Sequence, residues 1–162
     1  MDTHNRRMKR YKNISKVLFV LYMVAVCYFM FLADGFNRTM VSNTYRYNLR
    51  LFKEIERFGD VWNVHGSWLA LINLFGNVVC FIPFGFFVPF HGKALRSIVF
   101  VTCLTFLFSL LIEVTQLVFK IGVFDVDDLL LNTIGGFIGY LCYYVTIKVY
   151  IRIRRSKVKK EV

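Results

Sequence analysis

Four long apolar blocks dominate this 162-residue chain, and more polar stretches separate them. The blocks cover residues 17–32, 68–90, 97–119 and 126–151. A membrane-spanning helix needs about 20 mostly apolar residues, and the first block reaches that length only with its flanks. The bilayer core offers no water to backbone N–H and C=O groups, so such segments must be helical. We therefore predict an all-α integral membrane protein, a bundle of four transmembrane helices.

Polar side chains interrupt three of these blocks. Within each block they are three, four or seven residues apart, which places them on one face of the helix. They are Asn73 and Asn77 in the second block, Glu113 and Gln116 in the third, and Asp125, Asp128 and Asn132 at the start of the fourth. A carboxylate near the bilayer centre costs roughly 2.5–3.5 kcal/mol on insertion scales, so these groups need partners, water or a ligand. We treat all of them as candidate ligand-binding residues.

The expected depth of these side chains is similar on the three helices. At 1.5 Å per residue, Asn73 lies roughly 7–8 Å from the start of its helix, and Glu113 and Asn132 each lie roughly 9 Å from the nearest end of theirs. In a bundle of four spans, those three helix ends are on the same side of the membrane. The pattern therefore predicts one polar pocket within a single leaflet.

Some of these residues also have a purely structural explanation. Asp125 can cap the fourth helix while Asp128 complements the helix dipole, and for Asp125 we favour capping over ligand binding. Asn and Gln side chains often join helices within membrane bundles. Asp127 points away from Asp125 and Asp128, which predicts a solvated side chain. For Glu113 we favour a functional role, because a buried carboxylate is a costly way to join two helices.

The oxygen-rich side chains leave two kinds of chemistry open. Glu113 and Asp128 together could bind a hard divalent cation such as Ca²⁺ or Mg²⁺, or act as acid and base on a lipid headgroup. The cluster contains no His, Cys or phosphate-binding glycine loop, and Gly135 and Gly139 form a small-xxx-small pair typical of helix packing. We predict no cofactor, with a divalent cation as the open alternative, and favour binding over catalysis.

Basic residues concentrate in three zones: residues 1–16, the turn 91–96 and the tail 152–162. With four spans these zones lie on one side, which the positive-inside rule makes cytoplasmic. The chain then divides into a basic cytoplasmic segment 1–16, a transmembrane domain 17–151 and a basic cytoplasmic tail 152–162, with both termini inside. We expect the first span to be an uncleaved anchor, because no small-residue cleavage site follows it. The net charge of +11 is thereby explained without nucleic acid, and it favours anionic lipid.

Residues 50–58, between the first two spans, have an amphipathic pattern. Leu51, Phe52, Ile55 and Phe58 recur at helical spacing, and charged residues occupy the opposite face. This pattern predicts a short amphipathic exoplasmic helix in the outer headgroup region. Such a helix could act as a lid over the polar pocket or could simply cover the bundle, and the sequence leaves both open.

Three segments together resemble the signature of VanZ-like membrane proteins. Residues 73–85 match N-x-x-G-N-x-x-x-F-x-P-F-G, residues 113–116 match E-x-x-Q, and residues 125–135 match D-x-x-D-x-x-x-N-x-x-G. Residues 48–52 are similar to the N-L-x-P-F segment of that family. The resemblance covers residues 45–145 in the family's order, so the chain is identified as a member of the VanZ-like family.

Two positions depart from the family pattern. Leu51 stands where the N-L-x-P-F segment has its proline, which makes that loop less rigid. Gly122 and Val123 stand just before the aspartates, where many members have an arginine. Lys120 is then the only cation expected near the carboxylates, so the pocket is open to a cationic ligand.

The resemblance implies a bacterial plasma-membrane protein associated with resistance to teicoplanin, a glycopeptide antibiotic with a lipid tail. Lipoglycopeptide antibiotics and lipid-linked cell-wall precursors both lie in the outer leaflet, beside the predicted pocket. We therefore expect a protein that binds or excludes such a lipid-anchored molecule, with membrane lipid as its other partner. An intramembrane enzyme that modifies a wall precursor or a lipid headgroup is the alternative.

Overall fold

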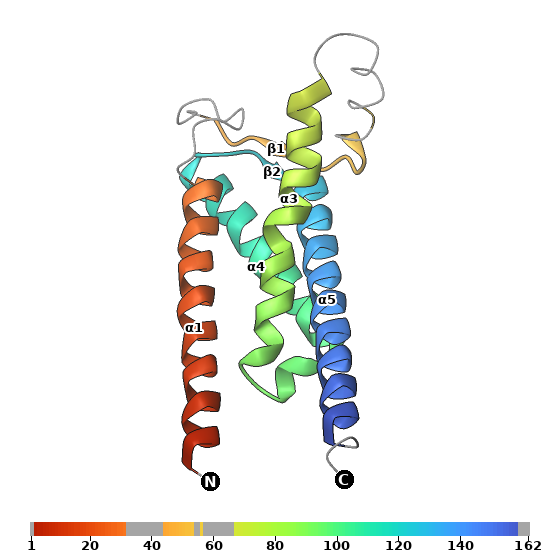
Figure 1. The fold of residues 1–162 in the computed structure, drawn as a ribbon. Helices are drawn as coiled ribbons and strands as arrows, with labels where there is room; N and C mark the ends of the chain where they lie inside the picture. The colour runs from red at the N-terminus through yellow and green to blue at the C-terminus, as the bar shows by residue number, and fades with distance from the viewer. Residues whose placement is uncertain (1, 32–43, 54–55, 57–66, 159–162) are drawn as a thin grey trace.

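In the computed structural model, the long helices lie side by side and form an elongated bundle (Figure 1). The structure describes the backbone of residues 2–31, 44–53, 56 and 67–158, and the side chains of residues 13–31, 44–53, 56 and 74–156. The helices are α1 (Asp2–Phe31), α3 (Ser67–Phe87), α4 (Ile98–Phe119) and α5 (Val126–Val158). Two 3₁₀ helices, η1 (Val88–Phe90) and η2 (Ala94–Arg96), connect α3 to α4.

Among the described residues, three helices contain a stretch long and apolar enough to cross a membrane. These stretches are Asn13–Phe31 in α1, Ile98–Phe119 in α4 and Val126–Ser156 in α5. In α3 and η1 the described apolar stretch, Leu74–Phe90, is shorter. The helical membrane class is therefore confirmed, and the fourth span stays a prediction. The 21 residues of α3 agree with it, because they extend roughly 30 Å.

The helix ends differ from the predicted spans in two ways. Helix α1 begins at Asp2 and α5 continues to Val158, so both run into the basic terminal segments. Lys and Arg are good helix formers, and a helix need not end at the membrane surface. Helix α3 instead ends at Phe87, where the chain passes into η1. Pro89 lacks the N–H that would continue the α-helix.

The bundle has two distinct ends (Figure 1). Helix α1 begins and α5 ends at the same end, which we call the terminal end. Two short strands, β1 (Tyr47–Asn48) and β2 (Phe124–Asp125), lie at the opposite end, which we call the β end. Both ends of the described chain on one side agree with the even number of spans that we predict.

Helices α3 and α5 form the most extensive contact between elements, and glycines allow it. A Cβ atom on Gly139 would lie 2.0 Å from the carbonyl oxygen of Ile82, and one on Gly135 would lie 2.2 Å from that of Val78. No larger side chain fits at either position, so the two backbones meet directly. The packing role predicted for Gly135 and Gly139 is confirmed.

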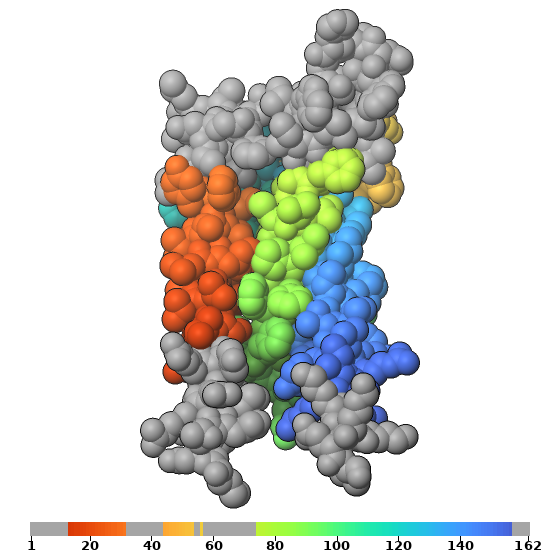
Figure 2. All heavy atoms as spheres, in the orientation of Figure 1, coloured from red at the N-terminus to blue at the C-terminus, as the bar shows by residue number. Residues whose placement is uncertain are grey.

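Two clusters of buried apolar side chains fill the bundle. The cluster toward the terminal end contains Phe84, Val88, Val101, Tyr140 and Tyr143. The cluster toward the β end contains Val26, Met30, Phe81 and Ile112. Figure 2 shows α1, α3 and α5 side by side on one face of the molecule. Many large apolar side chains on the outer helix faces are exposed, as contact with lipid requires.

Candidate functional site at the β end

The site is organised by a parallel pair of two-residue strands that the sequence pattern did not lead us to predict. Tyr47 pairs with Phe124 and Asn48 pairs with Asp125. The Phe124 N–H donates a hydrogen bond of 3.1 Å to the carbonyl oxygen of Arg46. This pairing holds the segment that follows α1 against the start of α5. Within the described part of the chain, these strands are the departure from an all-α fold.

Asp125 lies at the junction of β2 and α5. Its two carboxylate oxygens accept hydrogen bonds of 3.1 and 3.0 Å from the side-chain amide of Asn48. Its Oδ1 also accepts the N–H of Asp127 at 2.9 Å, which satisfies one of the free donors at the start of α5. The capping role that we favoured for Asp125 is confirmed.

Glu113 links α4 to the same junction. It is 2% exposed, and its Oε2 accepts the backbone N–H of Asp125 at 2.9 Å. A charge-assisted hydrogen bond of this kind offsets part of the cost of burying a carboxylate. Because Asp125 lies between Glu113 and Asn48, three segments that are distant in the sequence meet at this one residue.

Asp127 is buried, and our prediction that it is solvated is wrong. Only 3% of the residue is exposed, and its Oδ1 accepts the backbone N–H of Phe52 at 2.6 Å. Phe52 has a φ of 65°, a conformation that non-glycine residues adopt only rarely. Helical geometry contained no information about the segment that covers Asp127.

The remaining predicted residues join pairs of helices. Asn77 of α3 donates a short hydrogen bond to Oδ1 of Asp128 on α5. Gln116 of α4 donates to the carbonyl oxygen of Met30 on α1 at 2.9 Å, so it faces α1 rather than the aspartates. The side chain of Asn73 lies outside the described residues.

Asn132 lies deeper than the aspartates and belongs to a different contact. It is 1% exposed, and its Nδ2 donates to Oγ of Ser109 at 2.9 Å. Ser109 is one helical turn before Glu113 on α4, so Asn132 lies about one turn further into the bundle. Its Oδ1 is buried and has no hydrogen-bond partner.

We call Glu113, Asp125, Asp127 and Asp128 the acidic cluster. Burial raises the pKa of the Asp125 carboxyl above its ordinary value. The hydrogen bonds from Asn48 and from the Asp127 amide lower this pKa, the Asp127 carboxylate raises it, and the charge of Lys53 lowers it. Burial and these hydrogen bonds therefore act in opposite directions on the pKa of Asp125.

Lys120 is not the only cation near the acidic cluster, so that expectation is wrong. Lys53 is close enough to act on Asp125, and Arg46 directly precedes β1. The amine of Lys120 lies 4.7 Å from the centre of the Tyr45 ring. Spacing along the sequence could not place Arg46 and Lys53 here, because strand pairing brings them from another segment.

The described residues contain no group of three or more His, Cys, Asp or Glu side chains arranged to hold a metal ion. The four carboxylates of the acidic cluster come from two helices and one strand. The carboxylates of Glu113, Asp125 and Asp127 accept backbone N–H groups. The arrangement is suited to fastening segments together at one end of a bundle.

Part of the predicted amphipathic helix over residues 50–58, including Ile55 and Phe58, falls outside the described residues. Lys53 and Glu56 have helical backbone, and the Glu56 N–H donates to the carbonyl oxygen of Phe52 at 2.8 Å. Neither the lid nor the simple cover is decided by these contacts.

Sequence reasoning did not place Asn48, which is 8% exposed, beside Asp125. A signal was present, because Asn48 begins the 48–52 segment that is similar to the family's N-L-x-P-F motif. Ser109 was also missed, because a single serine in an apolar helix carries no signal of its own.

Together, the fold and the site define a multi-pass helical membrane protein that carries a partly buried acidic cluster at one end. The sequence model of the VanZ/LLP1 family matches residues 19–148. The chain therefore belongs to the VanZ/LLP1 family. A similar relative is Protein VanZ of Enterococcus faecium, which is 30% identical over 140 residues that cover 85% of this chain and 78% of the relative. No solved structure matches the chain significantly.

Proposed function

We propose that this protein protects against lipid-tailed glycopeptides of the teicoplanin class by binding a lipid-anchored molecule at the β end. Family membership supports the antibiotic class, since the chain resembles Protein VanZ along most of its length. The ligand would be the antibiotic itself or the lipid-linked wall precursor that it meets in the same leaflet. Under this proposal the β end faces the outside of the cell.

The observation that carries the proposal is a row of exposed apolar side chains on the segment that contains β1. Tyr45, Tyr47 and Leu49 are 61%, 66% and 65% exposed. Tyrosine suits the membrane–water boundary because its ring is apolar and its hydroxyl is polar. The row therefore offers an amphiphilic surface to a molecule whose tail lies in the membrane and whose head lies in water.

The acidic cluster has two roles in this proposal. Glu113, which is buried, positions the row by holding β2 and thereby β1. Asp125 and Asp128 are only half-buried, so they can attract an amine on the headgroup of the ligand. The candidate residues Asn77, Gln116 and Asn132 then act as positioning residues between helices.

The lipid tail of the antibiotic matters because it holds the drug in the membrane, beside the β end. An acyl chain gains on the order of 0.8 kcal/mol for each buried CH₂, so the tail keeps the drug at the membrane surface at high local concentration. A glycopeptide without a tail, such as vancomycin, lacks this advantage. A protein that acts at the outer leaflet is therefore expected to protect better against teicoplanin than against vancomycin.

The first test is expression of the chain in a susceptible Gram-positive host. We expect tolerance to teicoplanin to rise more than tolerance to vancomycin, measured as growth inhibition under equal expression. Equal protection against both drugs would contradict the proposal, because it would indicate a general effect on the wall.

The second test uses Glu113→Gln, which keeps the volume of the side chain but removes its charge. We expect a partial loss of protection with an unchanged amount in the membrane, because the amide oxygen of Gln can still accept the Asp125 N–H but without the charge that strengthens this hydrogen bond. Tyr47→Ala should also reduce protection, whereas Tyr150→Ala, an exposed tyrosine on α5, serves as the matched control. Full protection by both Glu113→Gln and Tyr47→Ala would refute the proposed surface.

Direct binding by the purified protein separates binding from catalysis. We expect a fluorescent teicoplanin derivative to bind saturably, and unlabelled teicoplanin to displace it. Chemical turnover of a wall precursor or lipid headgroup in the same preparation would instead favour the enzymatic alternative.

A further inference from the structure

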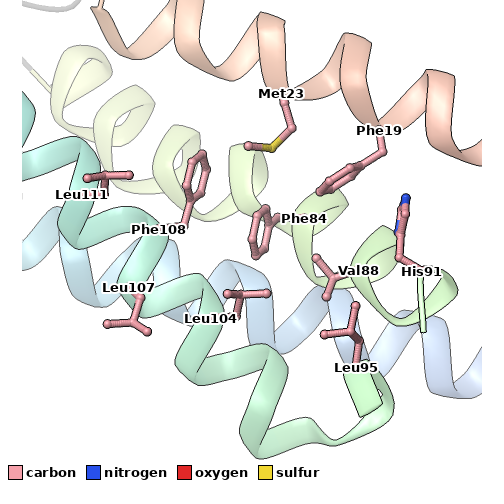
Figure 3. A pocket seen from close by; sticks show the side chains of 10 residues that line it. All are labelled: Phe19, Met23, Phe84, Val88, His91, Leu95, Leu104, Leu107, Phe108 and Leu111. Atoms are coloured by element: carbon pink, nitrogen blue, oxygen red, sulfur yellow. The ribbon is translucent and has the colours of Figure 1, made fainter. Parts of the chain in front are cut away.

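A cavity of about 440 Å³ lies away from the β end, between α1, α3 and α4 (Figure 3). The helices contribute Phe19 and Met23 from α1, Phe84 from α3, and Leu104 and Phe108 from α4. Its volume falls within the range of about 300–1,000 Å³ that is typical of ligand sites. It is separate from the acidic cluster, which contributes no lining residue.

The cavity is apolar and open toward lipid. Leu107 and Leu111 of α4, which line it, are 57% and 62% exposed. On its inner side, the rings of Phe84 and Phe108 stack with their centroids 5.1 Å apart. Water in such a cavity would find too few polar partners, so a flexible hydrocarbon chain is the natural occupant.

One end of the cavity is polar. His91, toward the terminal end, is exposed and lines the cavity, and its ring centroid lies 4.9 Å from that of Phe19 (Figure 3). Its Nδ1 is 3.0 Å from the carbonyl oxygen of Phe87, which orients the ring. The cavity therefore has an apolar body and a polar end where the chain turns between α3 and α4.

Positive charge surrounds this polar end. Lys93 and Arg96 lie on either side of Leu95, which lines the cavity, and both are exposed. Lys16 is exposed and lies one helical turn before Phe19 on α1. Basic groups near a membrane surface attract anionic headgroups. An apolar cavity beside a basic rim matches the two parts of an anionic phospholipid.

We propose that this cavity binds one anionic glycerophospholipid from the leaflet at the terminal end. One acyl chain occupies the space between α1 and α4, and the phosphate lies beside His91 and Lys93. The bound lipid fills the gap between α1 and the rest of the bundle. This proposal is independent of the antibiotic, because none of the lining residues belongs to the acidic cluster or to the segment that contains β1.

Native mass spectrometry of the full-length protein, released from detergent, tests the headgroup preference. Dioleoyl phosphatidylglycerol and dioleoyl phosphatidylcholine have the same acyl chains and differ in headgroup. We expect a single bound phosphatidylglycerol, favoured over phosphatidylcholine roughly fivefold or more. Equal retention of the two lipids would overturn the proposed phosphate site.

Two pairs of variants test the two parts of the cavity. Leu107→Trp narrows the opening and should lower phosphatidylglycerol binding severalfold, whereas Val99→Trp, exposed on α4 outside the cavity, should not. Lys93→Gln should reduce the preference for phosphatidylglycerol, whereas Lys148→Gln on α5 should leave it unchanged. Equal effects of a variant and its control would overturn the site.

Cross-linking gives a readout that does not depend on a variant folding. Phosphatidylglycerol with a photoreactive acyl chain should label peptides that contain Phe19–Met23 or Leu104–Leu111. Labelling spread evenly over the outer faces of all helices would overturn the proposal. A dimeric mass without bound lipid would also overturn it, because a second copy of the chain would then cover this face.

Discussion

At the residue scale, the carboxylates of the acidic cluster act mainly as hydrogen-bond acceptors for other segments of the chain. Glu113 accepts from the backbone of Asp125, and Asp127 accepts from the backbone of Phe52. Removing one such partner leaves a buried polar group unsatisfied, which costs more than the bond itself contributes. Changes at these positions should therefore loosen the β end.

The raised pKa of Asp125 predicts a dependence of stability on pH. The folded protein keeps this proton at pH values where the unfolded chain has lost it, so stability falls as pH rises from the ordinary value of 3.8 through the folded pKa. Asp125→Asn cannot titrate. Raising the pH from about 4 to about 7 should therefore lower the Tm of the natural protein relative to that of this variant, measured by thermal unfolding in detergent. A constant difference in Tm would contradict the shift.

The pair of Ser109 and Asn132 predicts a double-mutant result. Ser109→Ala removes the acceptor of the Asn132 amide and should destabilise the protein by about 1–3 kcal/mol. Adding Asn132→Leu removes the unsatisfied group and should recover much of that loss, measured as Tm in detergent. If Ser109→Ala alone is neutral, the hydrogen bond contributes nothing to stability.

At the element scale, close packing of α3 against α5 positions the cluster. Gly135 and Gly139 let the two backbones meet, which brings Asn77 within reach of Asp128. The α5 helix also carries the cap residue at its start, so the same element serves both the packing and the site. A change in this interface should reach the β end without altering any polar residue.

Gly139→Ala should disrupt the interface, because its Cβ would lie 2.0 Å from the Ile82 carbonyl oxygen. Overpacking of this kind costs about 1–3 kcal/mol, so we expect a lower Tm in detergent and weaker protection in cells. Gly76→Ala on α3 is the matched control, since no described atom lies within 4 Å of its added Cβ. Similar losses for both variants would contradict the close approach at Gly139, because Ala is the better helix former and Gly76→Ala should not lower the Tm.

At the scale of the whole molecule, the acidic cluster and most of the apolar cavity lie toward opposite ends of the bundle. The helices that connect them run from one end to the other, and α1 begins where α5 ends (Figure 1). The acidic cluster at the β end and the basic turn that contains Lys93 and Arg96 toward the terminal end give the two ends different chemistry. This asymmetry makes the orientation in the membrane decisive for the proposed function.

The predicted orientation can be tested with single cysteines in a background that lacks Cys27, Cys80, Cys103 and Cys142. In intact cells, an impermeant thiol reagent should label Val123→Cys, beside β2, and should leave Ala94→Cys unlabelled until the cells are permeabilised. Labelling of Ala94→Cys in intact cells would show that the orientation in the membrane is the opposite of the predicted one. The reasoning is the positive-inside rule, because Ala94 lies among basic residues.

Much of the fold was predictable because long apolar runs constrain a chain in lipid strongly. The spans predicted over 97–119 and 126–151 correspond closely to α4 and to most of α5. The glycine pair and the Asp125 cap were also readable, because small-xxx-small spacing and the start of a helix are local features of the sequence. The start of α1 was not predictable, because the helix continues through charged residues that a search for apolar segments does not include.

The sequence by itself determined which segments are helices and which polar groups lie among apolar ones, because length, periodicity and capping are local properties. Only the tertiary structure decided the partner of each polar group. Asn48 and Asp125 are 77 residues apart in the chain, and a contact over that distance depends on how the helices pack. The burial of Asp127, the neighbourhood of Lys53 and the cavity between α1 and α4 all follow from that packing, so no local pattern could reveal them.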